Sequence, residues 1–177
     1  EGKIGTVLNV TGAATTRELQ RIAVEETRLG IPLIFALDVI HGYKTISPVP
    51  LAESCSWDME TIEASARMAA VEASAAGLQW TFAPMVDIAR DPRWGRGQET
   101  YGEDPYLTGR LSVGMIKGMQ GDDPKYLKTV ATAKHFAVHS GPEPLRHEFD
   151  ARTSVKDLWE TYLPAFEMAV TEAHVEG

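Results

Sequence analysis

The side chains best suited to chemistry stand in three stretches of the chain. Asp38 follows an apolar run, and a carboxylate on its glycine-bounded loop can accept hydrogen bonds from two neighbouring hydroxyl groups. Lys134 and His135 occupy adjacent positions after another apolar run. The segment 89–105 contains three arginines, four acids and three glycines, a charge density that requires either mutual ion pairing or a bound ligand. These stretches predict a site that holds a polar molecule.

Each of these residues also has a purely structural interpretation. Asp38 could cap a turn. Lys134 and His135 are neighbours on an expected strand, where successive side chains point to opposite faces, so either one of them is structural or the backbone there is irregular. For Arg93 and Arg96, at least one is expected to be structural, because four acids of the same segment could pair with them: Asp91, Glu99, Glu103 and Asp104.

Charge and motif spacing argue against several other classes of ligand. His135 and His139 lie on an expected strand and lack the glutamate of the helical zinc motif, so we expect no metal and no other cofactor. A formal net charge of -8 without a basic run argues against nucleic acid, which binds clustered lysine and arginine. No apolar run approaches the roughly 18 residues of a membrane span, so no membrane partner is expected. An uncharged ligand suits this chain better.

The elements that must position these residues follow a repeated pattern of an apolar strand and an amphipathic helix. Thr15 and Glu18 fit a capping box, Asp58 and Asp104 are expected N-caps, and Pro164 is expected to break the last helix. The expected strands are 4–10, 33–37, 78–86 and 129–138, and the expected helices are 15–30, 58–77, 104–120 and 154–175.

Strands that are apolar throughout and alternate with helices indicate a parallel sheet. The pattern therefore predicts an α/β fold of about four βα units, half of the eight that a closed barrel contains. In such folds ligands bind at the carboxyl ends of the strands, and the unusual polar residues gather there: Asp38, the segment 87–103, Lys134, His135, Glu143 and Arg146. The loops at the opposite ends are short and lack such residues.

A series of motifs in this chain resembles family 3 glycoside hydrolases, which remove sugars from the non-reducing ends of β-linked glycans. The resemblance runs through almost the whole chain and rests on these segments, in family order: 31–35, 38–42 (Asp-Val-Ile-His-Gly), 56–58 (Ser-Trp-Asp), 83–87 (Ala-Pro-Met-Val-Asp), 91–96 (Asp-Pro-Arg-Trp-Gly-Arg), 102–105 (Gly-Glu-Asp-Pro) and 134–137 (Lys-His-Phe-Ala). It implies that residues 1–177 are the N-terminal portion of the family's TIM-type (β/α)8 barrel domain, incomplete and without a second domain.

The resemblance also implies a site and a reaction. Asp38, Arg96, Lys134 and His135 match residues that hold the sugar in the cleaved subsite, and Arg146 resembles a further sugar-side arginine. The family's nucleophile, an aspartate in a Ser-Asp-Trp-like motif, and its acid/base are not found here, so no catalytic residue is assigned within the chain. The implied activity is that of a retaining exo-acting β-glucosidase, with a β-xylosidase as the alternative, and the family suggests a periplasmic or secreted location.

Two other hypotheses remain open at this point. Lys134 could be the Schiff-base lysine of an aldolase-like barrel, although phosphate-binding glycines are not found. The chain could instead be a non-catalytic sugar-binding or assembly fragment. A half-barrel exposes the apolar inner faces of its strands and an unpaired edge, so we expect as partners a β-glucoside or β-xyloside oligosaccharide and either the remainder of the barrel or a second copy.

Overall fold

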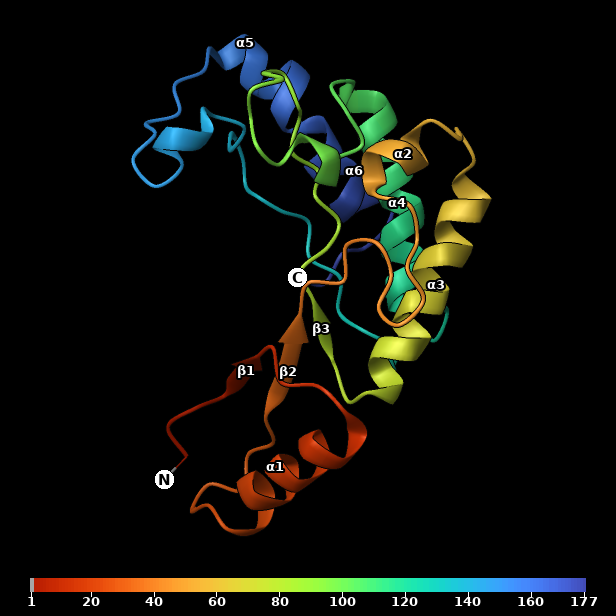
Figure 1. Cartoon of the computed structure of the whole chain (residues 1–177), viewed down its shortest axis with the longest axis vertical. Coiled ribbons are helices and arrows are strands. Elements are labelled where there is room, and N and C mark those ends of the chain that lie inside the picture. The colour runs from red at the N-terminus through yellow and green to blue at the C-terminus, as the bar shows by residue number, and fades with distance from the viewer. Residues whose placement is uncertain (1) are drawn as a thin grey trace.

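The computed structural model describes residues 2–177 and is built on a parallel sheet (Figure 1). Strands β1 (Thr6–Leu8), β2 (Ile34–Leu37) and β3 (Trp80–Thr81) lie in that order, with Val7 opposite Phe35 and Leu37 opposite Thr81. Helices α1 (Ala13–Glu25) and α3 (Met59–Ala75) connect these strands, and the short α2 (Pro50–Ser54) lies in the loop after β2. The α/β alternation expected from the sequence is confirmed.

The fourth strand and the end of the third are less regular than predicted. Segment 129–138 joins the sheet only through isolated bridges, Trp80 to Val130 and Met85 to Lys134. The backbone bonds nevertheless continue, from the Thr132 N–H to the Ala83 carbonyl (2.8 Å) and from the Lys134 N–H to the Pro84 carbonyl (3.1 Å). Pro84 has no N–H to donate, so a continuous ladder over 78–86 cannot form.

Two of the predicted helix starts are confirmed by side-chain caps. The Asp58 carboxylate accepts the Thr61 N–H (3.0 Å) at the start of α3. The Asp104 carboxylate accepts the Leu107 N–H (2.7 Å) at the start of α4 (Pro105–Gln120), which carries proline at its first position. An acid at the N-cap satisfies one of the free N–H groups of the first turn, which explains why these starts were readable.

The prediction for the first helix was wrong at both ends. Helix α1 starts after Gly12, whose positive φ of 100° is accessible to glycine, and no side chain caps it, so the expected capping box is not formed. Thr16 instead donates its hydroxyl to the Gly12 carbonyl (3.1 Å). At the other end the Thr27 hydroxyl donates to the Ala23 carbonyl (2.6 Å), and the helix stops before Gly30.

The last helical segment is divided, as Pro164 predicted. It consists of α5 (Val155–Asp157), a π-helical turn (Leu158–Tyr162) and α6 (Pro164–Thr171). Because proline cannot donate a backbone hydrogen bond, the ladder changes register just before it. Two short 3₁₀ turns, η1 (Gly97–Glu99) and η2 (Glu143–Leu145), lie in the loops after the third and fourth strand segments.

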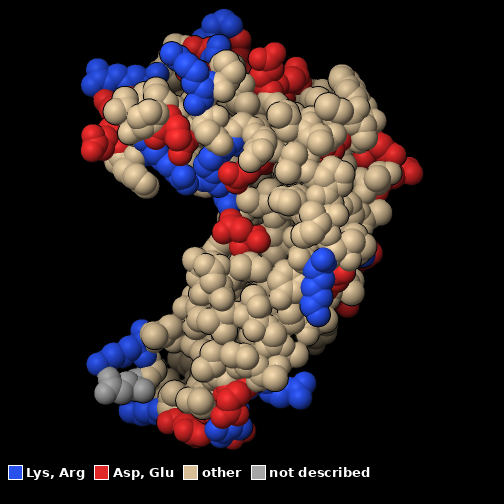
Figure 2. Space-filling model, viewed as in Figure 1, with Lys and Arg blue, Asp and Glu red and all other residues tan. Residues whose placement is uncertain are grey.

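Helices cover one side of the sheet and leave the other side open. Helices α3 and α4 run side by side on the covered side, and the opposite side is hollowed in the space-filling view (Figures 1 and 2). Apolar side chains near the first two strands are exposed, among them Ile4, Leu8, Ile31 and Ile34. In Figure 2 charged side chains gather in the upper part of the hollow, at the end toward which β2 points in Figure 1.

Small residues allow α3 and α4 to approach closely. A Cβ atom at Gly118 of α4 would lie 2.4 Å from the Glu63 carbonyl oxygen and 2.6 Å from the Ala66 Cβ on α3. Ala66, Ala69 and other alanines of α3 are buried in the same core. The contact is therefore close to backbone on both sides and has no room for an added methyl group.

Replacing Gly118 with alanine is expected to destabilise the protein by about 1–3 kcal/mol. The clash with the α3 backbone outweighs the roughly 1 kcal/mol that alanine contributes to helix propensity. Thermal unfolding measures this change, with Gly5→Ala as the control, because nothing lies within 4 Å of a Cβ added at Gly5. A Gly118→Ala protein as stable as the wild type would show that the helices are farther apart than described.

Candidate functional site

Asp38 and Lys134 meet at the carboxyl end of the sheet. Asp38 directly follows β2, and Lys134 stands on the fourth strand segment, 96 residues later in the chain. The Lys134 ammonium donates to Asp38 Oδ1 at 2.5 Å. The Lys134 side chain is 12% exposed while that of Asp38 is 50% exposed, so the second oxygen of the carboxylate can accept further hydrogen bonds.

Arg96 is held by Glu99 across the η1 turn. Its Nε and Nη2 atoms each donate to one carboxylate oxygen at 2.8 Å, the two-bond geometry that a guanidinium makes with a carboxylate. The hydrogen bonds from Arg96 hold the pKa of Glu99 below its ordinary value, and those same bonds raise the pKa of Arg96. Of the four acids that could have paired with Arg96, the structure selects Glu99.

His135 lies between a buried carboxylate and Arg96. Asp87 Oδ2 accepts the His135 backbone N–H (3.0 Å) and lies 2.9 Å from ring atom Nδ1. Ring atom Nε2 lies 3.3 Å from Arg96 Nη1. The backbone is irregular here, with a cis peptide between Lys134 and His135, and both side chains reach the same site. Of the two alternatives left open by strand alternation, the structure has the irregular backbone.

Arg146 stands apart from the other four predicted residues. Its nearest acidic partner is Glu143 at 3.4 Å, and its side chain is 39% exposed. It lines a cavity of about 50 Å³ with Trp94 and His139. The His139 ring lies 4.3 Å from the His135 ring, and burial lowers the pKa of His139. Arg146 is therefore connected to the cluster through His139 and not by direct contact.

Three supporting residues were not among the predicted site residues, although Glu99 was one of the possible partners of Arg96. Asp87 anchors His135, Glu99 orients Arg96, and His139 packs against the His135 ring. Asp87 could have been found, because it ends the third strand segment as Asp38 ends the second. His139 carried no such signal. Arg93 pairs with Asp91 and its side chain is 84% exposed, so both arginines expected to form ion pairs do so.

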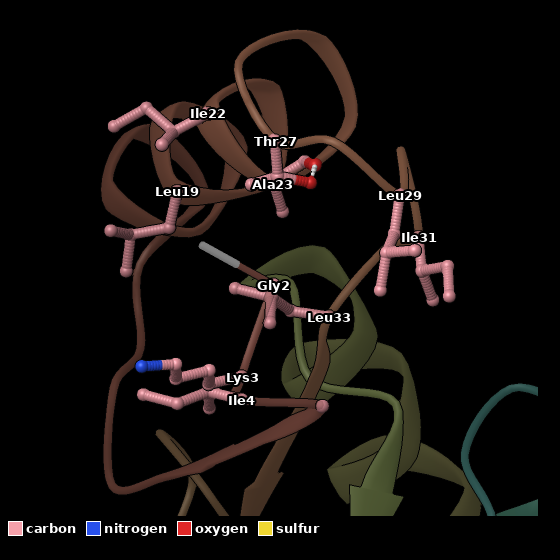
Figure 3. A pocket seen from close by; sticks show the side chains of 11 residues that line it. Gly2, Lys3, Ile4, Leu19, Ile22, Ala23, Thr27, Leu29, Ile31 and Leu33 are labelled. Atoms are coloured by element: carbon pink, nitrogen blue, oxygen red, sulfur yellow. Dashed lines mark hydrogen bonds between the residues drawn. The ribbon is translucent and has the colours of Figure 1, made fainter.

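An apolar cavity in the described part of the chain lies away from this cluster. It has a volume of about 460 Å³ and lies at the amino ends of β1 and β2, beside α1 (Figure 3). Apolar side chains such as Leu19, Ile22 and Leu33 surround it. The polar cluster is therefore separate from this apolar cavity, and it is the cluster that offers hydrogen-bonding groups to a polar ligand.

The described residues 2–177 contain neither a metal-binding cluster nor a membrane-spanning helix. Among them, no group of three or more His, Cys, Asp and Glu residues is arranged to hold a metal ion. No helix in this described range is both long enough and apolar enough to cross a bilayer.

Comparison with known proteins agrees with this architecture. The periplasmic β-glucosidase of Salmonella typhimurium is 38% identical over 167 residues, which are 94% of this chain and 22% of the relative. A xylan 1,4-β-xylosidase of Xylanibacter ruminicola is 58% identical over 98 residues, 54% of this chain and 11% of the relative. A β-glucosidase from Listeria innocua, solved in complex with glucose, superimposes with a TM-score of 0.89 at 42% identity, over 98% of this chain and 25% of that one.

The chain thus spans about a quarter or less of the length of these relatives. Its fold is the first part of a TIM-type barrel. The sequence model of the glycosyl hydrolase family 3 N-terminal domain matches residues 1–177, and the chain therefore belongs to glycosyl hydrolase family 3.

Proposed function

We propose that residues 1–177 supply most of one sugar subsite of a retaining, exo-acting β-glycosidase of the β-glucosidase type. The observation that carries this proposal is the convergence of Asp38, Arg96, Lys134 and His135 at the carboxyl end of the sheet. The names of the relatives, β-glucosidases and β-xylosidases, support the same reaction class.

The chemistry of these four side chains suits an uncharged sugar. A sugar hydroxyl both donates and accepts hydrogen bonds, and the cluster offers a half-exposed carboxylate on Asp38 beside the cationic groups of Lys134 and Arg96. Hydrogen bonds to charged groups are the strong ones, and each pair already holds its geometry before a ligand arrives. Arg146 contributes at the rim of the subsite, beyond His139.

The bond-breaking groups are expected outside residues 1–177. Retaining glycosidases use two carboxyl groups about 5–5.5 Å apart, one as nucleophile and one as acid/base. The carboxylates of the cluster are occupied otherwise, since Asp38 pairs with Lys134, Glu99 with Arg96 and Asp87 with His135. In this chain the site residues therefore bind and orient the sugar, in a barrel domain of which residues 1–177 are an incomplete part.

A β-xylosidase is the second candidate. Its support is the 58% identity with the xylan 1,4-β-xylosidase over 98 residues, higher than the 38% identity with the β-glucosidase over a longer stretch. The aldolase-like alternative is disfavoured, because the Lys134 Nζ atom is bonded to the Asp38 carboxylate and phosphate-binding glycines are not found in the sequence.

The proposed ligand is a β-glucoside or β-xyloside oligosaccharide, and the proposed location is periplasmic or secreted. The relative named a periplasmic β-glucosidase supports the location. The macromolecular partner proposed for the open side is the remainder of the barrel or, for the isolated chain, a second copy. The exposed side chains of Ile4, Leu8 and Ile34 and the apolar cavity beside α1 support such a partner.

The complete protein that carries residues 1–177 should hydrolyse aryl β-glucosides or β-xylosides, and Asp38→Ala should lower kcat/KM by about 10²–10⁴. Two charge-assisted hydrogen bonds that tighten in the transition state account for a loss of this order. Steady-state kinetics measure it. Asp123→Ala is the control, because Asp123 only caps a turn by accepting the N–H groups of Lys125 and Tyr126 (2.9 Å each). If Asp38→Ala keeps kcat/KM within about threefold of wild type, Asp38 only caps a turn, as Asp123 does.

Arg96→Lys should lower kcat/KM with little change in melting temperature. Lysine cannot reproduce the planar fork that bonds Glu99 through two nitrogens while a third nitrogen faces His135. The matched control is Arg93→Lys, which alters an exposed arginine in the same loop. If Arg96→Lys lowers both kcat/KM and the melting temperature, Arg96 forms a structural ion pair and does not hold the ligand.

The isolated 177-residue chain should hydrolyse no aryl β-glucoside and should associate with itself. It lacks the proposed bond-breaking carboxylates, and its open side exposes apolar surface. Activity assays and light scattering test both statements against the monomer mass of 19.4 kDa. Turnover that an activated fluoro-sugar blocks would show that a nucleophile lies within the chain, and a stable soluble monomer would show that the open side needs no cover.

A further inference from the structure

His135 is held by the carboxylate of Asp87, which solvent does not reach. The Asp87 side chain is 0% exposed, and its Oδ2 atom receives both the backbone N–H of His135 (3.0 Å) and a contact from ring atom Nδ1 (2.9 Å). Its Oδ1 atom is buried and has no hydrogen-bond partner among the described residues. Every polar contact of the Asp87 side chain in residues 2–177 is thus made to His135.

The second ring nitrogen faces a group that can only donate. Nε2 of His135 lies 3.3 Å from Arg96 Nη1, and a guanidinium has no acceptor atom. Nε2 must therefore accept, which leaves the ring proton on Nδ1. From there it is donated to Asp87. Both contacts select one form of His135, the neutral imidazole protonated at Nδ1, and this is the way in which a histidine tautomer is set by its partners.

The remaining neighbours of the His135 ring do not compete for its nitrogens. The His139 ring lies 4.3 Å away at an angle of 35°, a ring contact and not a hydrogen bond. Glu99 is bonded to Arg96, and Lys134 is bonded to Asp38. Asp87, Arg96, Glu99, Lys134 and His139 are the titratable or charged groups around His135, and only Asp87 and Arg96 reach its nitrogens.

We propose that Asp87 is a positioning residue that holds His135 in the Nδ1-protonated tautomer, so that the single lone pair of Nε2 accepts from Arg96 Nη1 and holds the guanidinium in place to donate to a sugar hydroxyl through its remaining N–H groups. Asp87 itself is buried and touches no ligand. The proposal rests on the proposed function, because it assigns the polarity of one contact in the sugar subsite. It leaves the subsite with the Asp38 carboxylate as acceptor and with Lys134 and Arg96 as donors to the sugar hydroxyls.

The first test compares Asp87→Asn with Asp91→Asn in the complete protein. An amide at position 87 offers a donor as well as an acceptor, so it no longer selects one tautomer, and kcat/KM should fall by about 10-fold to 10²-fold. Asp91 lies four residues farther along the chain and pairs with the exposed Arg93, so Asp91→Asn should change kcat/KM by less than about twofold. Unchanged kcat/KM in Asp87→Asn would overturn the proposal.

The second test reads the tautomer directly and needs no activity. Long-range ¹H–¹⁵N correlation spectra of protein labelled with ¹⁵N-histidine distinguish a protonated from an unprotonated ring nitrogen, and His135→Gln identifies the signals of His135. Wild type and Asp91→Asn should show a protonated Nδ1 and a bare Nε2 at neutral pH, and Asp87→Asn should lose this single pattern. A wild-type His135 protonated at Nε2 would overturn the proposal, even if Asp87→Asn fails to fold.

The two tests also separate this proposal from the function on which it rests. If the wild-type protein cleaves neither aryl β-glucosides nor aryl β-xylosides, the proposed function fails, while the spectra still decide whether Asp87 sets the tautomer. If hydrolysis is observed and the spectra show protonation at Nε2, the function stands and the role of Asp87 is wrong.

Discussion

Parallel pairing of the strand segments is the constraint on which the site depends. Parallel strands place their carboxyl ends at one edge of the sheet, so Asp38 after β2, Asp87 after the third segment and Lys134 on the fourth come together although they are far apart in the chain. Met85 is bridged to both Lys134 and Thr100, which connects the segment 89–105 to the fourth strand segment. The spacing of the site is therefore set by backbone bonds before any side chain is considered.

Charge pairing then determines what the site can bind. Lys134 faces Asp38 and Arg96 faces Glu99 as ion pairs, and the His135 ring donates to Asp87 through Nδ1. An unpaired buried charge costs several kcal/mol, so these pairs are needed for the cluster to exist without a ligand. An uncharged ligand leaves this balance intact and replaces water at the exposed oxygens, whereas a charged ligand would leave one member of a pair without compensation. The paired cluster is thus consistent with a sugar.

The sequence predicted the elements best where one residue decides an end. Asp58, Asp104 and Pro164 act locally, through a cap or a missing N–H, and all three behaved as expected. The predicted start of the first helix at Thr15 was wrong. The Thr16 hydroxyl donates to the Gly12 carbonyl, and the positive φ of Gly12 allows the helix to begin earlier. The prediction of regular strands over 78–86 and 129–138 was wrong, because Pro84 and the backbone at Lys134 interrupt the ladder of hydrogen bonds. Apolar composition does not reveal such an interruption.

For the site, the sequence predicted the residue types and the end of the sheet at which they lie, but not which acid pairs with which basic residue. Arg96 had several acids within reach in the sequence, and only the η1 turn selects Glu99. Arg146 depends on the loop after the fourth segment, whose course no periodicity predicts, and it lies beside His139 and not against Arg96.

The two ends of the sheet carry different kinds of side chain. Apolar side chains line a cavity at the amino end beside α1, and ion pairs lie at the carboxyl end. Because the same strands connect both ends, packing at one end holds the backbone that sets the distances at the other.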